Sequence, residues 1–143
     1  MVREETVAFF KHREELWRRR DAVGLAAGHT ESGVLESPMF GTVHGRGAIE
    51  KSYRDLFTAF ADLDVIIDDL IVDSDNRLVG QVFRASATHV HDFYGLPGSG
   101  RRFELRGVFV AKMDGGRIEH ERRFYDFTGL LVQVGVLKAK PGI

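Results

Sequence analysis

Residues 115–135 read GGRIEHERRFYDFTGLLVQVG and contain three structural signals in succession. The pair Gly115-Gly116, directly after Asp114, is typical of a tight hairpin connection between two strands. The residues that follow alternate in the manner of a strand, and the run LLVQVG then forms a closing segment. We expect any chemistry to centre on Asp126, which lies where this strand ends.

The side chains of this last strand fall into two rows that face opposite sides of the sheet. The odd-numbered row is entirely charged and consists of Arg117, Glu119, Glu121 and Arg123. The even-numbered row consists of Ile118, His120, Arg122, Phe124 and Asp126. A fully charged row is the cheaper one to expose to water. The alternation therefore predicts that the even-numbered row points inward, toward the helices.

An inward arginine and an inward carboxylate destabilise the fold unless each finds a partner or a wet cavity. Arg122 and Asp126 are four residues apart, about 13 Å along a strand, so each needs its own partner. Two structural alternatives stay open. Asp126 can serve as the N-cap of the helix that follows it, and Arg122 can bridge to an acidic residue on a helix.

The histidines of the preceding segment give a weaker signal. On the strand expected over residues 77–91, His89 and His91 share a face with Phe83 and Ala87. With His120 as a third ligand they could hold a metal ion. Such a pattern is common by chance, and a satisfied histidine at the edge of the core explains it as well. The sequence therefore predicts no metal site.

The rest of the chain predicts an α+β domain. Helical periodicity covers residues 6–20 and 46–60, with Thr6 and Asp21 as candidate N-caps for the first helix and for a short helix after it. Further strands are expected over residues 34–36, 40–43, 64–73 and 102–113. This order predicts a single domain over residues 1–143, with a curved antiparallel sheet and helices on one face.

Composition limits the possible partners and compartments. The chain has 143 residues, no cysteine and a formal net charge of −1. It therefore lacks disulfides, thiolate metal sites and the global basic field of a nucleic-acid-binding protein. We see neither a signal peptide nor an apolar run of the roughly 20 residues that a membrane span needs. We expect a cytoplasmic protein that has no nucleic-acid or membrane partner.

Several catalytic motifs are missing. The sequence has no GxGxxG or Walker A loop, no HExxH, no GxSxG and no cysteine nucleophile. The glycine-bearing loop GLPGSG, residues 95–100, does not follow the strand-to-helix pattern of a phosphate-binding loop. We therefore expect no cofactor.

Several segments together resemble one known family. Residues 88–107, THVHDFYGLPGSGRRFELRG, resemble the segment GTH-x-G-x-f-x-G-x-x-PTGr of SnoaL-like polyketide cyclases. The hairpin DGGRIE is similar to their dGkI-x-E motif, and YDF followed by LLVQVG is similar to their closing D-x-x-x-LLxQLG. These cyclases belong to the nuclear transport factor two-like, or ketosteroid-isomerase-like, superfamily. Ala87 stands in place of the family's glycine, and Gly98-Ser99 in place of its Pro-Thr.

The resemblance implies a cone: a strongly curved sheet wrapped around the N-terminal helices and one central amphipathic helix. It also implies a deep apolar pocket for a small hydrophobic ligand and a homodimer formed through the convex face of the sheet. In cyclases of this type an aspartate near the end of the last strand is the acid–base catalyst of a ring closure, without cofactor or metal. Asp126 occupies that position.

A carboxylate base works best with a raised pKa, which an apolar pocket supplies. The aromatic residues expected to line the pocket are Phe124, Phe109, Phe83, Phe40, Trp17 and Tyr53. A nearby donor then stabilises the enolate, and Arg122, His120 and His89 are the candidates.

The leading hypothesis is proton transfer on an apolar or aromatic carbonyl substrate, with Asp126 as the base. A second hypothesis is a ligand-binding or dimerisation module without catalysis, in which the polar interior is a structural network. A weaker third hypothesis is a water-activating hydrolase of the epoxide type. It requires Asp126, Arg122 and a second carboxylate such as Glu36 around one water molecule.

Overall fold

The computed structural model describes residues 2–138. The ends of the predicted domain, residues 1 and 139–143, lie outside the described residues. The helices are α1 (Arg3–Arg18), α2 (Ala22–Ala27), α3 (Arg46–Ala59) and α4 (Phe127–Gln133). The strands are β1 (His29–Ser37), β2 (Gly41–His44), β3 (Asp64–Val72), β4 (Leu78–Thr88), β5 (Arg102–Asp114) and β6 (Arg117–Tyr125).

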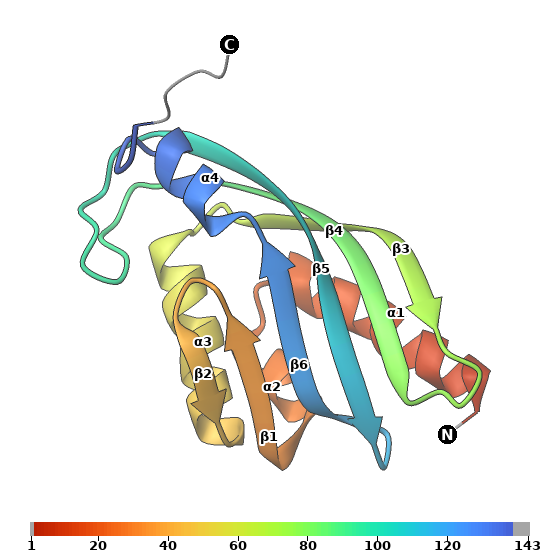
Figure 1. Ribbon diagram of the computed structural model, residues 1–143. Helices are drawn as coiled ribbons and strands as arrows, with labels where there is room; N and C mark the ends of the chain where they lie inside the picture. Colours follow the sequence, from red (N-terminus) through yellow and green to blue (C-terminus); the bar gives the residue numbers. More distant parts are fainter. Residues whose placement is uncertain (1, 139–143) are drawn as a thin grey trace.

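The six strands form one strongly curved sheet in the order β2-β1-β6-β5-β4-β3. Helices α1, α2 and α3 lie on one side of this sheet, and α4 lies at the end of β6 (Figure 1). All neighbouring strands are antiparallel except β1 and β6, which run parallel. The predicted cone-shaped α+β fold is confirmed, with a mixed sheet because of this one parallel pair. The sheet is not closed, since β2 and β3 are its edges.

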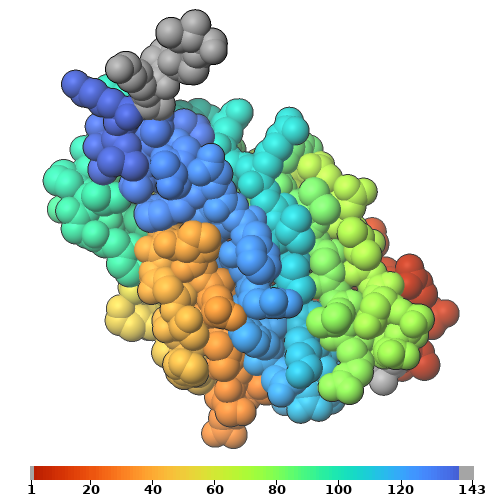
Figure 2. Space-filling view, viewed as in Figure 1, coloured from red at the N-terminus to blue at the C-terminus, as the bar shows by residue number. Residues whose placement is uncertain are grey.

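The outer face of the sheet is open to solvent. Figure 2, in the same view as Figure 1, shows β1 in orange, β6 in blue, β5 in cyan and β4 in green side by side on this face.

None of the helices among residues 2–138 combines the length and the apolar character needed to cross a membrane.

The helix caps differ in how well the sequence predicted them. Asp21 is the N-cap of α2, and its carboxylate accepts a hydrogen bond from the Gly24 backbone N–H at 2.8 Å, as predicted. The prediction for Thr6 was wrong, because α1 begins earlier, at Arg3. Thr6 lies within the first turns, and its hydroxyl donates to the Val2 carbonyl oxygen at 3.2 Å.

The predicted alternation of β5 is confirmed, because Phe103, Phe109 and Ala111 are buried on its inner face. Phe109 stacks on Phe83 of β4 with ring centroids 4.1 Å apart. Gly107, on the same face, allows this stack to lie close to β6: a Cβ there would stand 2.8 Å from the Phe83 ring and closer still to the Phe124 carbonyl oxygen.

The predicted orientation of β6 was wrong over most of its length. Ile118 and His120 stand opposite the adjacent residues Met113 and Lys112, so Glu119 is an extra residue that forms a β-bulge. A bulge of one residue reverses which side chains face inward. Ile118 is buried as predicted, but beyond the bulge it is Glu121 and Arg123 that are buried, with 3% and 7% of their surfaces exposed. The bulge therefore brings two charged residues into the interior.

Candidate active site

An apolar pocket lies between the helices and the inner face of the sheet, with a cavity volume of about 50 Å³. Its wall combines aromatic and aliphatic side chains from α1, α3, β4 and β5 with the turn before β2 and the loop between β4 and β5. The polar side chains in its lining are Ser37, Ser52, Tyr94, Arg123 and Tyr125. No carboxylate belongs to the described lining.

Four of the residues predicted to bind substrate line this pocket: Trp17, Phe40, Phe83 and Phe109. Trp17 stacks on Phe109 with ring centroids 5.7 Å apart. Tyr53 is fully buried behind this wall, where its ring meets Trp17 edge to face. The aromatic wall was therefore predictable from the sequence.

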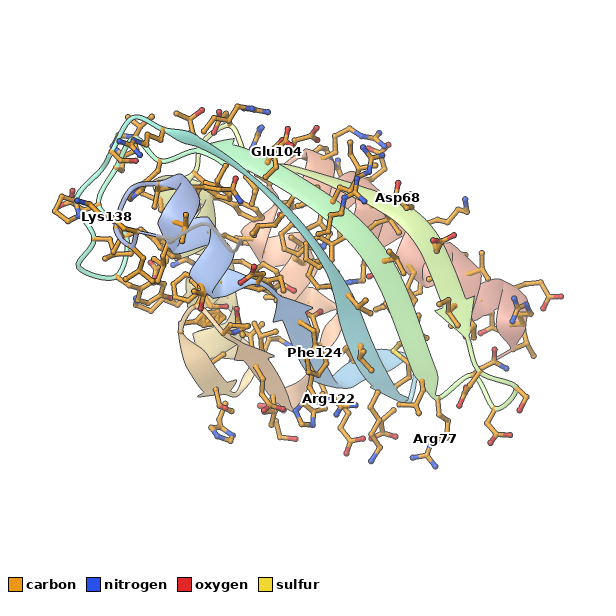
Figure 3. The ribbon with its side chains drawn as sticks, turned by 45° about the horizontal axis from the view of Figure 1, so that its top comes forward. Asp68, Arg77, Glu104, Arg122, Phe124 and Lys138 are labelled. Carbon is orange, nitrogen blue, oxygen red and sulfur yellow. The ribbon has the colours of Figure 1, made fainter. Side chains whose placement is uncertain are left out.

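Three other predicted site residues lie on the outer face of the sheet. Arg122 and Phe124 project from the outer side of β6 (Figure 3), where Phe124 is 53% exposed and the Arg122 guanidinium lies 5.8 Å from its ring centre. His120 pairs with Glu36 of β1. The expectation that these side chains face the helices was wrong because of the β-bulge at Glu119. Glu36 and Arg122, needed by the hydrolase hypothesis, are likewise turned away from the pocket.

Asp126 is exposed at the end of β6 and does not line the pocket. It is the N-cap of α4, and its carboxylate accepts a hydrogen bond from the Gly129 backbone N–H at 2.8 Å. The prediction that Asp126 points toward the helices was wrong, because its carboxylate is exposed and caps α4; the structural alternative, a helix cap, is the one present.

His89 is buried, as predicted, but it does not line the pocket. Its Nδ1 lies 3.1 Å from the Ser99 hydroxyl, and its ring packs against Phe60. His91, predicted to share this face, is exposed. Among residues 2–138 there is no group of three potential metal ligands.

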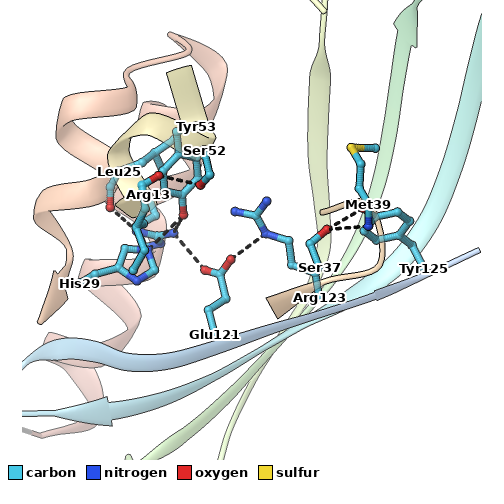
Figure 4. A network of polar contacts seen from close by, with 11 residues as sticks. Arg13, Leu25, His29, Ser37, Met39, Ser52, Tyr53, Glu121, Arg123 and Tyr125 are labelled. Atoms are coloured by element: carbon cyan, nitrogen blue, oxygen red, sulfur yellow. Dashed lines mark hydrogen bonds and ion pairs between the residues drawn. The ribbon is translucent and has the colours of Figure 1, made fainter. Parts of the chain in front are cut away.

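A buried polar network lies beside the pocket, with Glu121 at its centre (Figure 4). One carboxylate oxygen of Glu121 accepts from Arg13 Nη2 at 3.3 Å, and the other accepts from Arg123 Nε at 2.8 Å. Arg13 also donates to the Tyr53 hydroxyl and to the Leu25 carbonyl oxygen, each at 3.0 Å. One carboxylate therefore joins α1 to β6 and holds Arg123 in place.

His29 extends this network from β1. Its Nε2 lies 3.1 Å from the Tyr53 hydroxyl. The pKa of His29 is lowered from 6.5 to about 3: burial has the largest effect, the positive charges of nearby arginines add to it, and the Glu121 carboxylate opposes it. The imidazole is therefore neutral at pH 7, and Nε2 can accept the Tyr53 hydroxyl proton.

The charges of the network hold one another in their ionised forms. Burial alone would raise the pKa of Glu121, but the positive charges of Arg123 and Arg13 outweigh it and lower that pKa. Burial alone would lower the pKa of Arg123, and the Glu121 carboxylate outweighs it and raises that pKa. Glu121 is therefore an anion and Arg123 a cation, although both are buried.

The polar edge of the pocket is formed by Ser37, Tyr125 and Arg123. The hydroxyls of Ser37 and Tyr125 are 2.6 Å apart. Figure 4 shows the Arg123 guanidinium between this pair and Glu121. Burial raises the pKa of Tyr125, so its hydroxyl stays protonated and can donate. Arg123 Nη2 and Trp17 Nε1 are both buried, and neither has a hydrogen-bond partner within residues 2–138.

Sequence reasoning missed the interior charges, although one signal was available. Arg13 lies three residues after Phe10 and four before Trp17, within the apolar stripe of α1. An arginine in such a stripe needs a buried acidic partner. The odd-numbered row of β6 offers Glu121 as that partner, and this pairing would have favoured the orientation that the structure shows.

Comparisons with known proteins agree with this architecture. AclR from Streptomyces galilaeus, described as a putative hydroxylase, superposes with a TM-score of 0.81 at 22% identity, covering 98% of this chain and 91% of AclR. A putative SnoaL-like polyketide cyclase from Jannaschia sp. CCS1 gives a TM-score of 0.79 at 17% identity, covering 96% of this chain and 94% of that protein.

IdmH, a putative polyketide cyclase from Streptomyces antibioticus, gives a TM-score of 0.74 at 21% identity, covering 91% of this chain and 98% of IdmH. At these identities the similarity concerns the fold. Among curated protein sequences no match is found. The sequence profile of SnoaL-like polyketide cyclases, however, matches residues 9–134. The chain therefore belongs to the SnoaL-like polyketide cyclase family.

Proposed function

We propose that the protein is a cofactor-free, small-molecule enzyme of the cyclase type that transfers a proton next to the carbonyl group of an apolar or aromatic substrate. The observation that carries this proposal is the pocket: an aromatic enclosure with a protonated Tyr125 hydroxyl and a buried Arg123 cation at one edge. Donors fixed in a dry site stabilise a developing oxyanion far better than the same donors do in water.

In the proposed reaction a base removes a proton from the carbon beside the carbonyl group. The electron pair of the broken C–H bond forms a C=C bond, and the π pair of the carbonyl group moves onto its oxygen, which becomes the enolate oxygen near Tyr125 and Arg123. The described lining contains no carboxylate, so a carboxylate base has to stand outside it, next to a lining residue. We propose Asp126, which directly follows Tyr125 at the end of β6, and the same carboxylic acid then returns the proton.

A substrate has to widen the pocket. Its volume of about 50 Å³ holds a few water molecules but is well below the ~150 Å³ of an apolar cavity that admits benzene. Phe40, in the turn before β2, and Tyr94, in the loop after β4, both line the pocket with ring centroids 6.0 Å apart. Tyr94 is 53% exposed, so its ring can move aside with little loss of packing.

Exchange of carbon-bound protons tests the proposal without knowledge of the natural substrate. The ketone 2-tetralone is apolar and aromatic, and its protons beside the carbonyl group can be followed by NMR in D₂O. We expect the protein to accelerate this exchange and Tyr125→Phe to slow it by about 100-fold, the effect of losing one oxyanion donor. Thermal unfolding of both proteins controls for folding. Exchange that stays at the buffer rate with the wild-type protein contradicts the proposal.

A second candidate function is a binding module without catalysis, and the Glu121 network favours it. A hydrogen-bonded ion cluster is formed by Arg13, Glu121 and Arg123. Such a cluster can stabilise the walls of a ligand-binding site that catalyses no reaction. Saturable binding of 2-tetralone with no faster exchange would identify this function.

The family resemblance also suggests a homodimer through the convex face of the sheet. Exposed apolar side chains on the strands would contribute to such an interface: Ile66, Ile71, Leu78 and Phe124. Sedimentation equilibrium of the wild-type protein and of Phe124→Ser tests this proposal, and a wild-type monomer at high concentration contradicts it.

A further inference from the structure

The buried network has more positive than negative charge. Glu121 is shared by two guanidinium groups, Arg13 and Arg123, and all three side chains are nearly inaccessible to solvent. Arginine keeps its charge in proteins, whereas His29 and Tyr53 beside them are neutral. One positive charge of this network is therefore left without a counter-ion among residues 2–138. A buried charge is costly unless it is compensated.

The uncompensated charge borders the pocket. The two terminal nitrogens of Arg13 donate within the protein, to Glu121, Tyr53 and the Leu25 carbonyl oxygen. Its Nε has no partner among residues 2–138, but Arg13 does not belong to the described pocket lining. Arg123 lines the pocket and donates to Glu121 through Nε, while its Nη2 has no partner among residues 2–138. Trp17 Nε1, in the same lining, is a second buried donor without an acceptor. The described lining of the pocket therefore contains two buried donors without partners and no anionic side chain.

The surroundings of Arg123 favour a flat group. Its guanidinium carbon lies 5.5 Å from the Trp17 ring centre, 5.2 Å from that of Tyr53 and 5.7 Å from that of Phe109. Aromatic rings around the guanidinium pack against its faces, so a ligand can make polar contact only with the N–H groups at its edge. A planar oxyanion matches such N–H groups in geometry as well as in charge.

We propose that this pocket selects ligands that already carry a planar, delocalised oxyanion on an apolar ring, with the anion at Arg123 Nη2 and the ring against Trp17 and Phe109. The oxyanion is a carboxylate or the enolate of a 1,3-dicarbonyl compound. This proposal depends on the proposed function in one respect: both place the ligand in the same pocket. It adds that the ligand enters as an anion, whereas a neutral ketone needs Arg123 only as the enolate forms.

Matched ligands of the same shape separate charge from shape. Benzoate and benzamide are a small pair, and 2-naphthoate and 2-naphthamide are a larger one. Binding can be followed by calorimetry and by fluorescence of Trp17, the single tryptophan of the chain, which lines the pocket. We expect the carboxylate of a pair to bind about 10- to 100-fold more tightly than its amide, as charge-assisted hydrogen bonds do.

Adjacent arginines provide matched variants. Arg123→Met removes the pocket cation and should abolish the preference for carboxylate. Arg122→Met removes a charge from the outer face and should leave the preference unchanged. If Arg123→Met does not fold, the preference of the wild-type protein for carboxylate over amide still tests the proposal. Arg123→Lys should retain part of that preference because the charge remains.

The enolate arm uses 1-phenylbutane-1,3-dione, whose enolate has its own ultraviolet absorption. Binding in the pocket should lower the pH at which this absorption appears, and Arg123→Met should remove that shift. A shift without tight carboxylate binding identifies the ligand as an enolate, and tight carboxylate binding without a shift identifies it as a carboxylate.

The outcomes separate this inference from the proposed function. Equal affinity for carboxylate and amide, together with an unshifted enolate absorption, overturns the anionic ligand and leaves the pocket as a site for neutral carbonyl compounds. If no probe binds and Trp17 fluorescence does not change, both proposals are overturned.

Discussion

At the scale of single residues, Asp126 has a structural role as a helix cap and a proposed catalytic role as a base. Its carboxylate caps α4 by accepting from the Gly129 backbone N–H, and as an anion it can also accept a proton from a substrate. Asparagine is about as good an N-cap as aspartate, but its side chain cannot act as a base. Substitutions by asparagine and by alanine can therefore separate the capping role of Asp126 from its proposed catalytic role.

We predict that Asp126→Asn lowers the rate of 2-tetralone exchange by at least ~100-fold and leaves the unfolding free energy nearly unchanged. Asp126→Ala should lose the same activity and also about 1 kcal/mol of stability, because the cap is removed. Exchange rates and urea unfolding of the two variants check this. An Asp126→Asn variant with wild-type exchange would show that Asp126 is only a helix cap.

At the scale of secondary structure elements, the inner face of β5 and the start of β6 show what can be predicted from periodicity. Phe103, Phe109 and Ala111 alternate with exposed residues, and this pattern is sufficient to orient β5. The pattern of β6 contains charged residues in both rows, so it orients the strand only if the strand is regular. The bulge at Glu119 breaks that regularity.

This limit explains which parts of the site were found. Trp17, Phe83 and Phe109 were placed correctly because each stands in a mostly apolar stripe or row, which faces the core. Phe124 stands in a row with charged residues and is exposed. Arg123 and Tyr125 were missed because their inward orientation depends on the bulge and on distant parts of the chain: Arg13 pairs with Glu121, the partner of Arg123, and Ser37 pairs with Tyr125. Such long-range pairings leave little trace in local periodicity.

Gly107 offers a test of how closely β5 and β6 are packed. A Cβ at Gly107 would stand 2.8 Å from the Phe83 ring and closer still to the Phe124 carbonyl oxygen, whereas a Cβ at Gly80 of β4 would meet nothing closer than 3.8 Å. We predict that Gly107→Ala destabilises the protein by about 1–3 kcal/mol through overpacking. Gly80→Ala should be neutral or slightly stabilising.

Urea unfolding of both variants measures this difference. A Gly107→Ala protein as stable as Gly80→Ala would contradict the close approach of the two strands at the aromatic stack.

At the scale of the whole molecule, the curved sheet and the three helices on its inner side enclose both an aromatic pocket and a charged network. The network depends on a neutral His29, which faces Glu121, Arg13, Arg123 and Arg46 in addition to Tyr53. The stability of the entire fold should therefore depend on pH in a range where carboxylates do not yet titrate.

The direction follows from the two states of His29. Its pKa is about 3 in the folded protein, against 6.5 in the unfolded chain, so between these values only the unfolded chain binds the proton. Stability is therefore complete above pH 6.5 and falls as the pH drops, by roughly 2 kcal/mol at pH 5. Urea unfolding at several pH values measures the slope.

His29→Gln should flatten the slope between pH 6.5 and 5, whereas His12→Gln, at an exposed position of α1, should not change it. An unchanged slope in His29→Gln would contradict the buried, neutral state of this histidine.

Two adjacent arginines test most directly whether the functional site lies on the inner face of β6. Arg123 lines the pocket, and Arg122 projects from the opposite face of the same strand. The measurement is the rate of 2-tetralone proton exchange in the wild-type protein, Arg123→Met and Arg122→Met, each shown to be folded. We predict a loss of about 100-fold in Arg123→Met and a wild-type rate in Arg122→Met. The contradicting result is wild-type exchange in a folded Arg123→Met protein together with slowed exchange in Arg122→Met. That result would show that the functional site does not lie on the inner face of β6.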